Sequence, residues 1–141
     1  MVASAAIMVS CSNDGDLEVS SKSLVGVWKE SKIIHYNKQD DGTWVVEYER
    51  EITRDAYNLV LFADGRAIEL PANESYDPDE DIDYYWLLKG NRIYWTNTKG
   101  KIDEPDDYDV IYQVSSTELV LAEEFDARKY VIYYIKVSDK P

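Results

Sequence analysis

Five aromatic residues on two neighbouring segments are the strongest indication of a binding site in the sequence. They are Tyr84, Tyr85, Trp86, Tyr94 and Trp95. Adjacent residues of a strand face opposite ways, so these rings must occupy both faces of the hairpin that the two segments form. Planar rings with a polar tip suit sugars and apolar ligands equally. We therefore take the five residues as candidate ligand-binding residues, with a two-layer core as the alternative.

Two acidic segments, residues 77–83 and 103–109, could gather oxygen ligands around a hard cation such as calcium. The calcium-loop pattern fails in the first segment, because Ile82 stands where the pattern needs glycine and Leu88 where it needs glutamate. We expect solvated loops that do not bind calcium tightly. The sequence predicts no metal site and no cofactor.

Catalysis has little support in the sequence. His35 is the only histidine and Cys11 the only cysteine, and His35 lies among apolar residues of an expected strand. The chain has no Gly-x-Ser-x-Gly nucleophile elbow and no glycine-rich loop that opens a helix for phosphate. A glycosidase needs only two carboxylates, but a barrel of this size offers no long cleft. We expect a protein that is not an enzyme.

Composition narrows the class of partner. The 141 residues suggest one domain, and 28 acidic against 15 basic side chains give a net charge of −13. This charge excludes nucleic acid, which needs a basic surface, and it repels an anionic membrane surface. Twelve Tyr and four Trp against two Phe favour strands with half-buried walls.

The start of the chain is uncharged and mostly small or apolar up to the run Met-Val-Ser-Cys that ends at Cys11. This run resembles the lipobox of bacterial lipoproteins, in which the cysteine becomes the new N-terminus and carries the lipid. No Lys or Arg precedes it, so we expect the natural start to lie upstream or the signal to be truncated. Residues 1–10 are then a residual signal segment, 11–23 the lipidated cysteine and a flexible tether, and 24–141 the folded domain.

The rest of the chain alternates apolar and polar residues in short runs separated by turn residues, with hairpin signals at Asp64-Gly65 and Gly90-Asn91. The expected strands are residues 24–36, 43–52, 58–63, 66–70, 83–89, 92–97, 108–115, 118–125 and 129–137. Closing such a meander removes its edges. The sequence therefore predicts an all-β fold: an antiparallel up-and-down meander closed into an eight- or nine-stranded barrel.

Gly26 and Trp28, at the start of the first long strand, resemble the Gly-x-Trp motif of lipocalins. Residues 62–65 and 118–137 also look like bacterial lipocalin-like lipoproteins, and the likeness covers residues 24–137. The resemblance implies a lipocalin-like barrel in which the glycine permits a tight bend and the tryptophan plugs the closed end. Fold alone does not give function.

Two classes of function remain open. The first is a non-catalytic envelope lipoprotein whose barrel binds a small apolar or glycan ligand. The second is a structural, protein-interaction or inhibitor module that docks on another envelope protein. Its barrel would be filled if five large rings all pointed inward, namely Trp28, Trp44, Tyr48, Tyr108 and Tyr112. In both cases we expect attachment to the outer membrane of a Gram-negative bacterium, through the lipid on Cys11 only.

We predict that Cys11 is the membrane anchor. When the protein is expressed from its full-length gene in a Gram-negative host, it should enter the detergent phase of a Triton X-114 separation. Cys11→Ala should stay in the aqueous phase, because alanine cannot accept a lipid, whereas Ser12→Ala should behave as the wild type. If Cys11→Ala remains just as membrane-bound, the lipoprotein interpretation is wrong.

Overall fold

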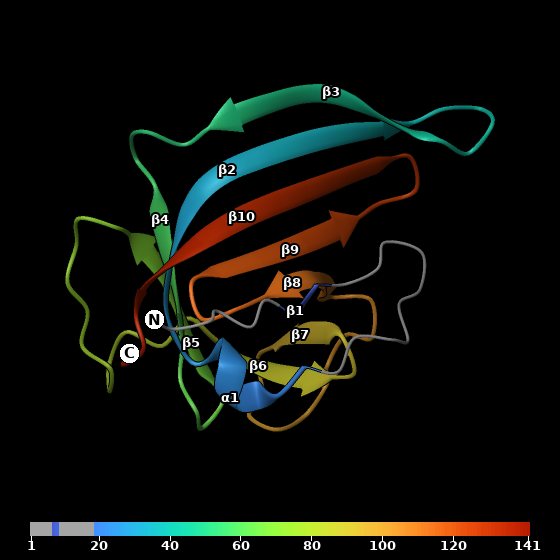
Figure 1. Cartoon of the computed structure of the whole chain (residues 1–141). Helices are drawn as coiled ribbons and strands as arrows, with labels where there is room; N and C mark the ends of the chain where they lie inside the picture. The colour runs from blue at the N-terminus through green and yellow to red at the C-terminus, as the bar shows by residue number, and fades with distance from the viewer. Residues whose placement is uncertain (1–6, 9–18) are drawn as a thin grey trace.

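The structure, a computed structural model, describes residues 7–8 and 19–141 and is built almost entirely from strands (Figure 1). The elements are β1 (Ile7–Met8), α1 (Ser21–Leu24), β2 (Gly26–Lys38), β3 (Trp44–Glu51), β4 (Tyr57–Leu61), β5 (Arg66–Pro71), β6 (Tyr84–Lys89), β7 (Arg92–Thr96), β8 (Tyr108–Val114), β9 (Glu118–Glu124) and β10 (Arg128–Ser138). Strands β2 to β10 match the nine predicted segments to within two residues. No helix among the described residues is long and apolar enough to cross a membrane.

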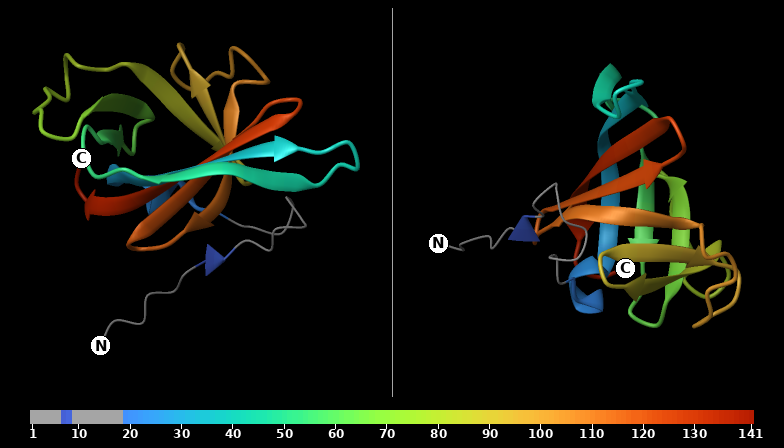
Figure 2. Two further views of the ribbon diagram at one scale, coloured as in Figure 1. Left: turned by 90° about the horizontal axis from the view of Figure 1, so that it is seen from above. Right: turned by 90° about the vertical axis from the view of Figure 1, so that its right-hand side faces the viewer.

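Eight of these strands form a closed antiparallel barrel, which confirms the predicted fold class. The order around the barrel is β2, β4, β5, β6, β7, β8, β9 and β10, and β10 pairs again with β2. Pairing between β8 and β9 completes the ring, and the two further views show strands on all sides of one interior (Figure 2). β1 pairs with β8 from outside this ring.

The sequence predicts eight or nine barrel strands, and the ninth is β3, which pairs with β2 but does not belong to the closed ring. The first part of β2 pairs with β4 and the second part with β3, so the β2–β3 hairpin projects beyond the barrel (Figure 1). Almost all of β3 is exposed. Alternation predicts Val46 and Tyr48 on one face, and this is wrong: Val46 pairs with Tyr36 while Tyr48 pairs with His35. A bulge inserts one residue between the two pairs and turns their side chains to opposite faces.

The main core lies inside the barrel. It contains a buried side chain from each of the eight barrel strands and one from α1, namely Leu24, Trp28, Leu59, Leu61, Ala67, Trp86, Ile93, Ile111, Val114, Leu119, Leu121 and Tyr134. Burial of this apolar surface is the main force that holds the strands together.

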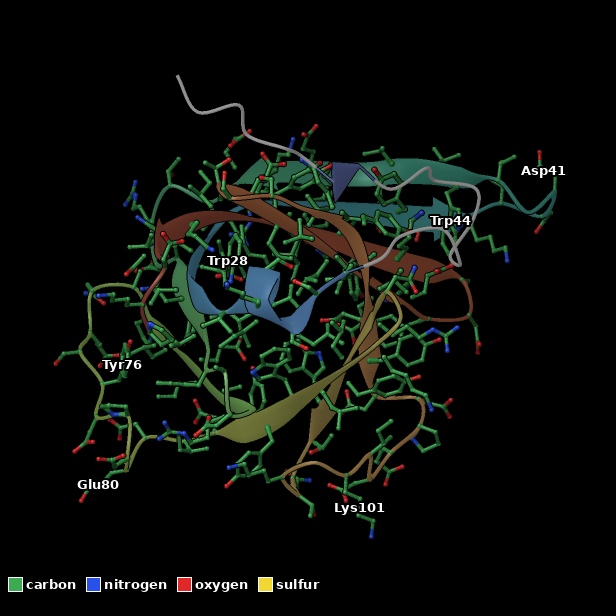
Figure 3. The ribbon with its side chains drawn as sticks, turned by 60° about the horizontal axis from the view of Figure 1, so that its bottom comes forward. Trp28, Asp41, Trp44, Tyr76, Glu80 and Lys101 are labelled. Carbon is green, nitrogen blue, oxygen red and sulfur yellow. The ribbon has the colours of Figure 1, made fainter. Side chains whose placement is uncertain are left out.

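A second cluster covers the outer face of β2, β4 and β5. Val27, Val60 and Ile68 are buried there beneath the β5–β6 connection, which contributes Tyr76 and Ile82. The acidic segment 77–83 lies on this connection, and Glu80 points away from the barrel (Figure 3). The predicted solvated loop is therefore attached to the barrel by apolar side chains.

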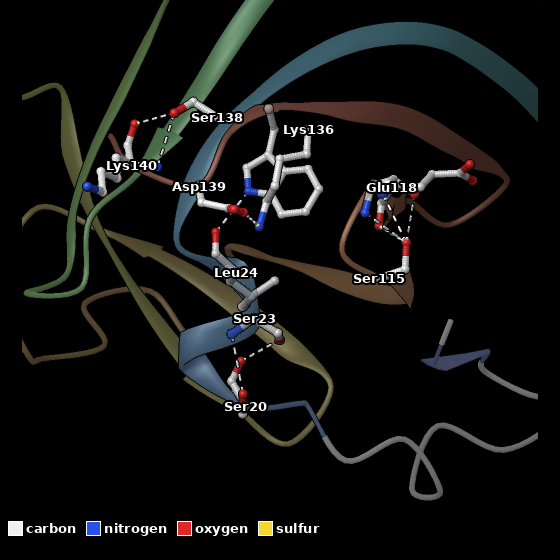
Figure 4. A network of polar contacts seen from close by, with 11 residues as sticks. Ser20, Ser23, Leu24, Ser115, Glu118, Lys136, Ser138, Asp139 and Lys140 are labelled. Atoms are coloured by element: carbon white, nitrogen blue, oxygen red, sulfur yellow. Dashed lines mark hydrogen bonds and ion pairs between the residues drawn. The ribbon is translucent and has the colours of Figure 1, made fainter. Parts of the chain in front are cut away.

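One end of the barrel is closed by Trp28. Its side chain is fully buried, its indole N–H donates to the Leu24 carbonyl oxygen at 2.8 Å, and the Lys136 ammonium lies 4.6 Å from the ring centroid. Asp139 in turn holds Lys136 at 3.1 Å (Figure 4). Gly26 has a φ of 145°, and a Cβ there would lie 2.6 Å from the Ser138 carbonyl oxygen, so only glycine allows this approach of β2 to β10.

The described fold begins before residue 24. Val19 packs against the main core, and the Ser20 hydroxyl accepts a hydrogen bond from the Ser23 backbone N–H at the start of α1. These residues fall in the segment 11–23 that the sequence assigns to a tether. Cys11 lies outside the described residues.

Trp28→Ala should lower the free energy of unfolding by about 3–5 kcal/mol, because it leaves a large cavity in the closed end of the barrel. Urea unfolding of the soluble domain measures the change. Trp44→Ala, on the exposed hairpin, is the matched control and should cost about 1 kcal/mol or less. A loss below about 1 kcal/mol for Trp28→Ala would show that the ring does not support the core.

Candidate functional site

The side chains inside the barrel change along its axis, from a buried apolar core to aromatic and acidic residues. Each of five strands carries a core residue and, two positions along the same strand, a side chain that lines a cavity instead of the core. The pairs of core and cavity residues are Ala67 and Glu69, Trp86 and Tyr84, Ile93 and Trp95, Ile111 and Asp109, and Leu121 and Glu123. Because side chains two apart share a face of a strand, all five point into the same interior. They surround a cavity of about 370 Å³, here called the barrel cavity.

The barrel cavity is a cup with an acidic rim and a deeper aromatic and apolar wall. The rim side chains Glu69, Asn97, Asp107 and Glu123 are exposed. Deeper in the cup lie Leu59 and Ile132, the half-buried Tyr84, Trp95 and Asp109, and Tyr134, which is only 6% exposed. The cup therefore combines an apolar and aromatic inner surface with carboxylate groups at separate positions.

Two hydrogen bonds orient the cavity wall. The Tyr84 hydroxyl donates to a Glu69 carboxylate oxygen at 3.0 Å, and the Trp95 indole N–H donates to Asp109 Oδ2 at 3.1 Å. The two rings also meet edge to face, with centroids 5.3 Å apart. Each ring is thus held by a carboxylate and by its aromatic neighbour, which is the rigidity that a binding wall needs.

Burial and crowding of like charges make Asp109 an unusual carboxyl group. Burial raises its pKa to about 7, and the nearby carboxylates of Glu123, Asp107 and Glu69 add to the rise, while the hydrogen bond from Trp95 opposes it. Burial also raises the pKa of Glu123, and the Asp107 charge reinforces this. Burial, with the charges of Asp109, Glu30 and Glu69, raises the pKa of Tyr134 well above its ordinary value.

The five candidate ligand-binding residues are divided between the inner and outer faces of β6 and β7, as alternation along a strand requires. Tyr84, Trp86 and Trp95 face inward, and of these Tyr84 and Trp95 line the barrel cavity. Trp86 is 6% exposed, belongs to the core and donates its indole N–H to the Phe62 carbonyl oxygen. Tyr85 and Tyr94 take the outer face between these positions. The structure thus brings two of the five side chains together in one cavity.

The rings that would fill the barrel lie mostly elsewhere. Of the five large rings considered for the interior, only Trp28 belongs to the main core. Trp44 and Tyr48 lie on β3, which pairs with β2 outside the closed ring. Tyr108 packs on Tyr94, and Tyr112 packs against the outer cluster of β9 and β10. This distribution leaves room for the barrel cavity.

Sequence reasoning missed the inward carboxylates and Tyr134. The signal was present in part, because Glu69 and Glu123 each stand two residues from an apolar position of their strand. A charged residue at a strand end is usually solvated, so the pattern alone does not point inward. The sequence marks Asp109 only as a member of the acidic segment 103–109.

His35 and the acidic segment 77–83 lie outside the barrel cavity and contact their own neighbours. His35 stacks on Tyr48 with centroids 4.0 Å apart, and its Nε2 lies 2.8 Å from the Tyr48 hydroxyl. In the segment 77–83, Asp77 and Asp81 accept hydrogen bonds from backbone N–H groups of the same loop. Within residues 7–8 and 19–141, no group of three or more His, Cys, Asp or Glu side chains is arranged to hold a metal ion.

Comparison with known proteins adds no relative. No family model matches the chain, and neither a curated protein nor a solved structure matches it. The site is therefore interpreted from its own geometry.

Asp109→Asn should stabilise the folded protein at pH 8 and have little effect at pH 4.5. Protonated Asp109 is favoured in the fold, so its contribution to stability is lost as the pH rises from about 4 to about 7. Asparagine keeps an acceptor for Trp95 and does not ionise. A rise of about three pKa units corresponds to about 4 kcal/mol, and solvent in the cup reduces this effect, so we expect a gain on the order of 2 kcal/mol.

Thermal unfolding at the two pH values measures this difference. Asp40→Asn, which removes one exposed charge at the tip of the β2–β3 hairpin, is the control and should show no such pH dependence. Equal effects of the two substitutions at pH 8 would place Asp109 in full contact with solvent.

Proposed function

We propose that the protein is a non-catalytic binding module that holds a small organic ligand in the barrel cavity. The observation that carries this proposal is the change of the inward positions from buried apolar residues to Glu69, Tyr84, Trp95, Asp109 and Glu123. Glu69 and Glu123 at the rim could be solvated strand ends, but the half-buried Tyr84, Trp95 and Asp109 continue the cavity below the rim. The volume of about 370 Å³ lies within the range of small-ligand pockets.

The proposed ligand contacts are the rings of Tyr84 and Trp95, with Leu59 and Ile132 as the apolar floor. The two rings are fixed by hydrogen bonds and by each other, so little side-chain entropy is lost when a ligand binds. The proposal includes no reaction, and a bound ligand should be recovered chemically unchanged.

The proposed setting is the bacterial envelope. Cys11 would carry the lipid that the lipobox resemblance implies, and the barrel would stand beyond a short spacer from the outer membrane. The closed end, with Gly26 against β10 and Trp28 in the core, supports the proposed kinship with lipocalin-like lipoproteins, because this is where the Gly-x-Trp motif of that family lies.

A second candidate function is docking to another envelope protein through β3. Among the described strands, only β2 pairs with this strand, and Val45, Val46 and Tyr48 on it are 45–51% exposed. An exposed edge of this kind can accept a strand from a partner. The carboxylates of Glu47, Glu49 and Glu51 oppose self-association of the edge, so a partner would have to bring positive charge.

Trp95→Ala should weaken binding of a small ligand about tenfold, which corresponds to about 1.4 kcal/mol for a lost aromatic wall. The probes are the neutral fluorophore N-phenyl-1-naphthylamine and a glycan array, used with the soluble domain. Tyr85→Ala, which changes the outer face of the neighbouring strand, should leave binding unchanged. Binding that survives Trp95→Ala and is lost in Tyr85→Ala would place the site on the outer face.

A further inference from the structure

We propose that the ligand of the barrel cavity is a small organic cation, with an ammonium group on an apolar or aromatic body. The inference rests on the proposed function and names the ligand class of the same cavity. It is carried by three features of the cup: the sign of its charges, the polar oxygen atoms that face the cavity at its depth, and its aromatic walls.

The charges of the cup all have one sign. Glu69, Asp107, Asp109 and Glu123 line it, and no Lys, Arg or His side chain within the described chain does so. None of these four carboxylates forms an ion pair with a described residue. The walls of a concave site concentrate the field of such a group of charges, so a cation is attracted and an anion is excluded.

The depth of the cup presents two oxygen atoms to the cavity for which no described residue is a hydrogen-bond donor. Trp95 donates to Oδ2 of Asp109, and no described residue donates a hydrogen bond to the other carboxylate oxygen. Tyr134 is 6% exposed and lines the cavity, and its hydroxyl forms no hydrogen bond with a described residue. A primary ammonium group has three N–H donors to offer to such oxygens, and its hydrogen bond to a carboxylate is strengthened by the charges of both groups.

The walls suit the body of such a ligand. The rings of Tyr84 and Trp95 meet edge to face, so they present faces in different directions around the cavity. Aromatic faces attract cations, most strongly where water is excluded, and they also pack against apolar groups. Leu59 and Ile132 complete an apolar surface next to the charged point.

An inorganic cation does not fit the same features. A calcium ion requires six to eight oxygens that converge on one point. The described carboxylates do not converge in this way, since no group of three or more metal-binding side chains occurs among residues 7–8 and 19–141. A neutral sugar could donate hydroxyl groups to the carboxylates, and the experiment below distinguishes it from a cation.

Cation binding should become stronger as the pH rises through about 7. Asp109 faces Glu69 from β5, Glu123 from β9, Asp107 before β8 and the Trp95 N–H from β7. Burial raises its pKa to about 7, and the charges of the three acids add to the rise. Ionised Asp109 attracts the ligand and protonated Asp109 does not, so binding increases as this group loses its proton. Choline, whose charge does not titrate, isolates this effect from any change in the ligand.

The test compares two matched pairs of probes by isothermal titration calorimetry with the soluble domain at pH 8. The pairs are choline with its neutral isostere 3,3-dimethylbutan-1-ol, and 2-phenylethylamine with 2-phenylethanol. At least one cationic member should bind about tenfold or more tightly than its neutral partner. Asp109→Asn should remove most of this preference, Tyr134→Phe should weaken the amine more than the alcohol, and Asp40→Asn should change neither.

The outcomes separate the two proposals. If neutral and cationic members bind equally and Asp109→Asn changes nothing, the cation inference is wrong and the cavity still binds a ligand. If no member of either pair binds, the cation inference is also wrong, and the proposed function is then decided by the fluorophore and glycan probes with Trp95→Ala. Thermal unfolding of each variant shows that a loss of binding does not reflect a loss of fold.

Discussion

Closure of the barrel is the constraint on which the other features of the molecule depend. β8 pairs with β7 on one side and with β9 on the other, so the eight strands form a continuous ring. In a closed ring the inward side chains of all strands converge on one axis. This convergence lets Glu69 of β5, Asp109 of β8 and Tyr134 of β10 share one cavity although they are far apart in the sequence.

Inward side chains recur every two residues along each strand, so they form successive layers along the barrel axis. Two such layers differ in composition. The lower layer contains Trp28 and the apolar side chains around it, and its burial supports the fold. The upper layer carries the aromatic and acidic side chains of the barrel cavity. Since adjacent layers are only two residues apart on each strand, the wall of the barrel cavity rests directly on the core, which keeps Tyr84 and Trp95 in fixed positions.

The nine long strands could be predicted from the sequence because alternation and turn residues are local signals. The turn signals at Asp64-Gly65 and Gly90-Asn91 correctly predict the β4–β5 and β6–β7 hairpins. Which face of a strand turns inward is not local. Both faces of β8 carry apolar residues, and a register shift between Ile111 and Gln113 interrupts the alternation, so the inward position of Asp109 depends on pairing with distant strands. The pleat likewise predicts that the five candidate rings divide between two faces, but not which of them meet the cavity.

Asp109 is the side chain that a purely structural barrel would not need. An aliphatic residue at this inward position would extend the apolar layer, whereas this carboxyl group, whose pKa is raised to about 7, is half-buried beside three other acids. The Trp95 N–H stabilises one of its oxygens, but no described cation balances its charge. The folded state therefore loses stability as the pH rises from about 4 to about 7. A positive ligand of the proposed kind would be attracted by the charge that the fold leaves unbalanced. The same residue that makes the folded state less stable at pH 8 than at pH 4 is thus the one that, in our proposal, would give the cavity a preference for a cation.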